Sequence, residues 1–69
     1  QRLEVSVPAE FEHLFTSGEL ESLRGALSLD PRPHYHDDPD RVYGMPFAGR
    51  DVRFRVSDGR AVVVGVERL

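Results

Sequence analysis

The sequence predicts an α+β fold in which two short helices pack on one face of an antiparallel sheet. Three observations support this prediction. Apolar and polar residues alternate near the amino terminus and again in the last third of the chain, which is the period of half-buried strands. Between these segments, apolar residues recur every three or four positions, which is the period of helices. Asp58-Gly59 lies between two apolar runs and is a strong hairpin signal.

The amino-terminal part is predicted to form a strand followed by a short helix. Residues 2–7 alternate between polar and apolar side chains, as in a strand with one buried face. Pro8 suits the first position of the following helix, because proline lacks the amide hydrogen that a first turn leaves unpaired. The apolar face of this helix is expected to consist of Phe11, Leu14 and Phe15.

A second helix is expected to begin after Ser17, which we assign as its N-cap. The helix ends at the segment DPRP, 30–33, because proline cannot continue it. The longer segment DPRPHYHDDPDRVYG, 30–44, is rich in proline and aspartate and is interpreted as a connecting loop. The apolar face of the second helix is formed by Leu20, Leu23, Ala26 and Leu27.

The last part of the chain is predicted to be a meander of three antiparallel strands. Residues 41–47 suit an edge strand, because glycine and proline fit poorly in the middle of a sheet. Residues 51–56 alternate regularly, whereas 61–69 is apolar on both faces and is expected to lie centrally. The predicted core consists of Phe11, Phe15, Leu20, Leu23, Leu27, Val52, Phe54, Val62, Val64 and Val66.

Composition narrows the classes of protein to which the chain can belong. Its 69 residues suffice for one small α+β domain spanning 1–69. The chain has no cysteine, which excludes disulfides and thiolate metal sites. No apolar run approaches the roughly 20 residues that span a bilayer, and the first residues lack the pattern of a signal peptide. We therefore expect a cytoplasmic protein that does not contact membranes.

The formal net charge is −3, and all nine basic residues are arginines. An acidic total argues against a protein that coats nucleic acid with its whole surface, but it is compatible with a local basic stripe. The exclusive use of arginine has a plain explanation in GC-rich codon usage. It also fits recognition of phosphate or carboxylate groups by the planar guanidinium fork.

The order of strand, helical hairpin and antiparallel meander resembles the RelE/ParE toxin superfamily, whose members are small bacterial proteins of toxin–antitoxin pairs. The resemblance rests on LRGALSLDPRP, 23–33, and on YGMPFAGRDVRFRVSDGRAVVVGVERL, 43–69. The first is similar to the end of the family's second helix. The second is similar to its carboxy-terminal strands. The resemblance implies a RelE-like protein that cuts messenger RNA on the ribosome and binds an antitoxin.

Such RNA cleavage implies neither a metal nor a cofactor. It needs a base for the ribose 2′-hydroxyl, an acid for the leaving oxygen and cations that stabilise the charged phosphorane. Arginines that alternate along one strand suit the cationic role. The candidate catalytic residues are Arg50, Arg53, Arg55, Arg68 and His36, and the candidate RNA-binding residues are Tyr43 and His34.

Each candidate residue also has a plainer explanation. Alternating arginines commonly solvate the outer face of a half-buried sheet. Tyr43 suits the edge of a core as well as a stacking surface. His34 and His36 lie in a segment with ordinary loop composition, although together with a neighbouring aspartate they would also suit a metal ion.

Three functions therefore compete. The first is a toxin-like endoribonuclease with messenger RNA, the ribosome and an antitoxin as partners. The second is a non-catalytic module that binds a partner helix or strand, favoured because Asp51 occupies the position of the family's catalytic arginine. The third is a small metal-binding domain that uses His34 and His36. A second copy of the chain is a further candidate partner.

Overall fold

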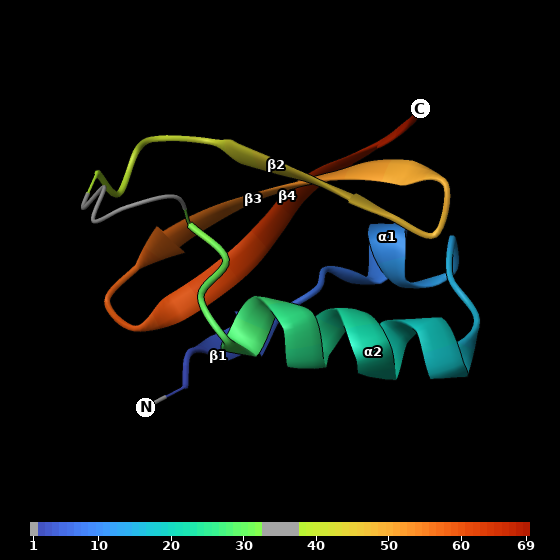
Figure 1. Cartoon of the computed structure of the whole chain (residues 1–69), viewed down its shortest axis with the longest axis horizontal. Helices are drawn as coiled ribbons and strands as arrows, with labels where there is room; N and C mark the ends of the chain where they lie inside the picture. Colours follow the sequence, from blue (N-terminus) through green and yellow to red (C-terminus); the bar gives the residue numbers. More distant parts are fainter. Residues whose placement is uncertain (1, 33–37) are drawn as a thin grey trace.

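A computed structural model describes residues 2–32 and 38–69 of the chain. Within these ranges it has four strands and two helices (Figure 1), which confirms the predicted α+β class. None of the helices in the described ranges is long and apolar enough to cross a membrane. In chain order, the elements are β1 (Glu4–Ser6), α1 (Ala9–Glu12), α2 (Ser17–Ser28), β2 (Tyr43–Phe47), β3 (Arg50–Ser57) and β4 (Arg60–Arg68).

The strands lie in the order β1-β4-β3-β2. The predicted antiparallel meander is present, because β2 pairs with β3 and β3 pairs with β4. β2 forms one edge of the sheet and β4 lies inside it, as the sequence predicts. β1 adds to the other side of β4 in the parallel direction, with Val5 opposite Ala61. This parallel pair brings the first and last strands of the chain together.

The core lies between the helices and one face of the sheet. Buried side chains from α2 meet buried side chains from β3 and β4, and Figure 1 shows α1 and α2 on the same side of the sheet. The opposite face of the sheet is not covered by any element within the described ranges. The buried residues are Val7, Phe15, Leu23, Leu27, Tyr43, Val52, Phe54, Val56, Ala61 and Val63.

The predicted core is wrong along β4. Arg53 lies opposite Gly65, but the next residue, Phe54, lies opposite Val63. Val64 is therefore skipped in the pairing and is the additional residue of a β-bulge. The bulge changes which residues face the helices. Val63 is fully buried, whereas Val64 is 40% exposed and Val62 is only partly buried.

The ends of the helices also differ from the prediction. Pro8 is the N-cap of α1 and not its first residue. The N-cap of α2 is Thr16 and not Ser17. The Thr16 hydroxyl accepts a hydrogen bond from the Glu19 amide at 3.1 Å, and the Thr16 amide donates to the Glu19 carboxylate at 2.9 Å. This reciprocal capping box fixes the start of α2 and supplies partners for two amides.

Two tight turns connect the strands of the meander. Asp58 and Gly59 have φ values of 52° and 74°, and Ala48 and Gly49 have values of 52° and 75°. Two consecutive positive φ angles are typical of type I′ turns, whose twist matches that of the flanking strands. The hairpin predicted at Asp58-Gly59 therefore forms and sets the registers of β3 and β4.

Candidate nucleic-acid interface

The sheet face turned away from the helices displays arginines from two neighbouring strands. Alternation along β3 directs Arg53 and Arg55 away from the core, and both are exposed. Arg60 of β4 lies on the same face, because it is directly opposite Ser57. We call Arg53, Arg55 and Arg60 the open-face arginines.

The open-face arginines differ in their acidic neighbours. Arg53 lies between two carboxylates, with Nε 3.3 Å from Asp51 Oδ2 and Nη2 3.5 Å from Glu67 Oε1. Arg60 Nη2 lies 3.3 Å from Glu4 Oε1. Arg55 forms no ion pair with any residue in 2–32 or 38–69, and it faces Val62 across the strands.

These ion pairs are exposed to solvent and are therefore weak. The side chains of Arg53 and Arg60 keep 46% and 58% of their surface exposed. Exposed pairs of this kind contribute between about 0 and 1 kcal/mol to stability. A phosphate group can therefore replace a carboxylate partner at little energetic cost. A hollow of about 410 Å³ next to Arg60 is lined by Glu4, Ser57, Asp58, Arg60 and Val62.

Charge is distributed unevenly between the sheet and the helices. β3 and β4 together contain five arginines and two acidic residues. α1 and α2 together contain four glutamates and one arginine. A polyanion is therefore repelled more strongly by the helical layer than by the sheet, where Glu4, Asp51 and Glu67 balance the three open-face arginines.

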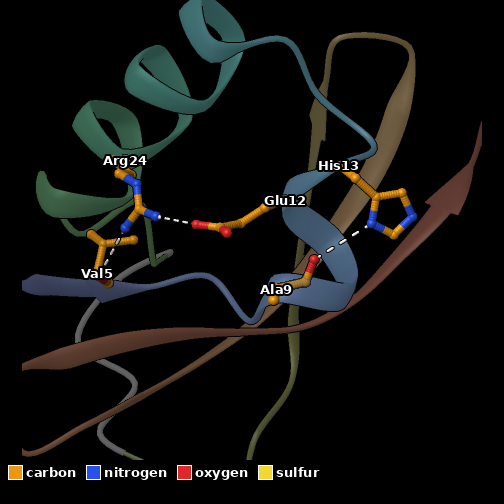
Figure 2. A network of polar contacts seen from close by, with 5 residues as sticks. All are labelled: Val5, Ala9, Glu12, His13 and Arg24. Carbon is orange, nitrogen blue, oxygen red and sulfur yellow. Dashed lines mark hydrogen bonds and ion pairs between the residues drawn. The ribbon is translucent and has the colours of Figure 1, made fainter.

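The arginine of α2 has a structural role. Arg24 Nη2 donates to Glu12 Oε2 at 2.9 Å, and its Nη1 donates to the carbonyl oxygen of Val5 at 3.4 Å (Figure 2). Arg24 thus connects α2 to α1 and to β1. His13 points away from this network, and its Nδ1 lies 3.4 Å from the carbonyl oxygen of Ala9 (Figure 2).

The predicted cluster of four sheet arginines is divided between the two faces of the sheet. Arg50 is directly opposite Arg68, and it shares the helix-facing side with Val52. Arg53 and Arg55 lie on the other side, because a strand turns alternate residues to opposite faces. Arg50 and Arg68 therefore cannot join Arg53 and Arg55 around one phosphate.

Of the two predicted RNA-binding residues, Tyr43 and His34, the structure describes only Tyr43. Tyr43 is buried, and its ring centroid lies 5.6 Å from that of Phe54. The Arg41 guanidinium lies 5.7 Å from the Tyr43 ring centroid. Tyr43 is therefore part of the core and does not present its ring to a base. His34 and His36 lie outside the described residues.

No group of three histidine, cysteine or acidic side chains that could hold a metal ion occurs in 2–32 and 38–69. The alternative metal site at His34 and His36 lies outside these ranges. The open-face arginines cannot ligate a metal ion, since arginine is always protonated in proteins. The chemistry that this face suits is the binding of anions.

One ion pair lies where α2 leads into the following loop. Arg32 donates from Nε and Nη2 to the two carboxylate oxygens of Asp30, both at 2.7 Å. The side-chain hydrogen bond from Arg32, together with its positive charge, lowers the pKa of Asp30, and burial opposes this shift only in part. Asp30 has a φ of 57°, in the left-handed region that non-glycine residues rarely adopt. The ion pair with Arg32 stabilises the backbone in this conformation after α2.

The Asp30–Arg32 pair predicts a pH-dependent contribution to stability. Because the pKa of Asp30 is lowered by folding, the contribution is present above the carboxyl's ordinary pKa of about 4 and is lost as the pH falls through the folded value. Asp30→Asn should therefore lower the free energy of unfolding at pH 7 by at most about 1 kcal/mol, and by less at pH 3. Urea unfolding at the two pH values measures this difference.

Asp40→Asn is the matched control, because it removes an exposed carboxylate from the same connection. A loss of stability with Asp30→Asn that is equal at both pH values would show that the ion pair is not its cause.

Comparison with known proteins identifies the family. The family model of the TrmO C-terminal domain matches residues 1–69. A tRNA (adenine(37)-N6)-methyltransferase from Eikenella corrodens is 42% identical over 41 residues. These residues make up 59% of the chain but only 23% of that relative. No solved structure matches the chain significantly.

These findings overturn the interpretation as a toxin. The assignment to the RelE/ParE superfamily, the messenger RNA endoribonuclease activity and the antitoxin partner are wrong, and the alternative of a partner-binding module on that fold has no better support. The resemblance rested on hydrophobic spacing and turn residues, which unrelated α+β proteins share. The chain belongs to the family of TrmO C-terminal domains.

Proposed function

We propose that this chain is a tRNA-contacting domain of an adenine-N6-methyltransferase and that the open-face arginines bind the tRNA backbone. The observation that supports this most strongly is the exposure of Arg53, Arg55 and Arg60 on the sheet face that the helices leave open. The curated relative, whose name describes methylation of adenine 37 in tRNA, supplies the class of nucleic acid.

The open-face arginines are better suited to positioning a nucleic acid than to transferring protons. Arginine remains charged in proteins, so it cannot act as a general base. Its planar fork donates two parallel hydrogen bonds to phosphate oxygens. Contacts of this kind fix where a nucleic acid lies and carry no sequence information. We therefore assign the domain a role in holding tRNA while a base is methylated.

The charge pattern supports the direction of approach. The acidic helical layer repels a phosphate backbone, whereas the open sheet face offers exposed guanidinium groups that can donate to one. Arg55 forms no ion pair within the described part of the chain, so a phosphate near it gains attraction without displacing a carboxylate. This proposal implies a cytoplasmic location, where tRNA is modified and used.

The test is the affinity of the protein for unmodified tRNA, measured by fluorescence anisotropy before and after neutralisation of Arg53 and Arg55. The proposal predicts weaker binding and a shallower dependence on salt, because fewer phosphate contacts release fewer counterions. Unchanged affinity in a folded variant would contradict it.

A further inference from the structure

Arg50 and Arg68 form a pair of like charges at one end of the sheet. They lie directly opposite each other on β3 and β4, at the last pair of the register. Directly opposite residues of an antiparallel pair share a face, and their Cβ atoms are about 5 Å apart. Both side chains project from the helix-facing side of the sheet. Arg50 is two residues from the buried Val52 on the same strand, so the two share a face.

Neither member of this pair has a counterion in the described part of the chain. Within 2–32 and 38–69, no hydrogen bond or ion pair joins either guanidinium to another side chain. By contrast, the arginines at 24, 32, 53 and 60 each lie within 3.5 Å of a carboxylate oxygen. Two like charges in direct opposition destabilise a sheet unless something neutralises them.

The surroundings of the pair favour electrostatic binding. Arg50 is half-buried, and Phe47 of β2 lies directly opposite it on the other side of β3. The Phe47 ring packs against Phe15, with ring centroids 6.0 Å apart. The partly buried ring of Phe47 lowers the local dielectric beside Arg50 and so strengthens the attraction of Arg50 to an anion, while Arg68 stays exposed and accessible.

We propose that Arg50 and Arg68 together bind one phosphate group. A phosphate offers three oxygens and enough negative charge to pair with both guanidinium forks, whereas a carboxylate would leave one arginine unneutralised. The site lies on the opposite side of the sheet from Arg53 and Arg55, so it does not depend on the role of the open face. The phosphate belongs either to an RNA backbone or to a small free phosphate compound.

The first test is thermal unfolding in inorganic phosphate and in chloride of equal ionic strength. At ten times its dissociation constant, phosphate should raise the unfolding midpoint by about 6–11 °C. Arg50→Gln and Arg68→Gln should each remove this increase, and the control Arg2→Gln, at an exposed position outside both arginine groups, should retain it. An equal increase in chloride, or an increase that survives in Arg50→Gln or Arg68→Gln, would overturn the proposal.

A charge exchange gives an independent readout in the absence of phosphate. Arg68→Glu replaces the repelling pair by an attracting one, so it should raise the midpoint by a few degrees and abolish the response to phosphate. A lower midpoint together with a retained response would contradict the assignment of the site to this pair.

A short single-stranded RNA distinguishes the two sources of phosphate. If RNA gives a response that requires Arg50 and Arg68, the ligand group is a backbone phosphate. If only inorganic phosphate does so, the ligand is a small free compound. A response to neither would overturn the proposal.

Discussion

Phe54→Ala should lower the free energy of unfolding by about 3–5 kcal/mol, which is the largest effect expected of any single substitution. Phe54 is 1% exposed and is among the largest buried side chains. Its ring contacts Tyr43 and lies in the cluster that joins the sheet to α2. A domain of this length is stable by only about 3–10 kcal/mol. The variant should therefore be largely unfolded under mild conditions.

Urea unfolding followed by circular dichroism measures this loss, and Val64→Ala is its control. Val64 belongs to the predicted core but is 40% exposed, because the bulge turns it away from the helices. Its truncation should cost less than about 1 kcal/mol. If both variants lose equal stability, the register of β4 beyond the bulge is wrong.

The second large effect concerns tRNA binding. Combined Arg53→Gln and Arg55→Gln should weaken tRNA binding by about 2 kcal/mol, or roughly 30-fold, because two charge-assisted contacts are lost. The slope of log affinity against log salt should also become shallower by about 1.5. Fluorescence anisotropy at several salt concentrations gives both quantities from the same samples.

A control for this variant must change the net charge equally. Combined Ser17→Glu and Ser22→Glu also shifts the net charge by two units, at exposed positions of α2 on the helical side. This control should change the affinity less than about threefold, because its charges lie far from the bound phosphates and are screened by salt. Equal losses in the two variants would show that tRNA responds to total charge and that the open face has no special role.

The antiparallel meander and its turn positions could be predicted because local chemistry specifies them. Asp58-Gly59 supplies the positive φ angles of a tight hairpin, and Gly44 and Pro46 keep β2 at the edge. The capping box also has a readable signal, since Glu19 lies three residues after Thr16 and not after Ser17. The parallel pairing of β1 has no comparable local signal, because it depends on how the helices return the chain to β4.

Which side chains of β4 face the core could not be predicted from periodicity. The segment AVVVGV contains valines in both phases, so either set can face the core. Gly65 was a usable signal, because an isolated glycine within a strand often marks a bulge. The division of the arginines was readable from the sequence as well, since positions 50 and 53 have opposite parity in one strand.

The family was misassigned for a physical reason. Hydrophobic spacing reports which side chains are buried, and many α+β proteins of this size bury the same pattern. The open-face arginines were visible in the sequence as an alternating pattern, but a pattern of charges does not define a reaction. Their exposure and the placement of Arg68 opposite Arg50 required the register of the sheet.

The most direct measurement is a titration of the isotopically labelled protein with unmodified tRNA, monitored through the side-chain Nε–H signals of its arginines. We expect the signals of Arg53, Arg55 and Arg60 to shift or broaden first, while that of Arg24, held by Glu12 and Val5, stays unchanged. Shifts confined to Arg24 and the amides of α2, with the open-face arginines unaffected, would contradict the assignment of this sheet face to tRNA binding.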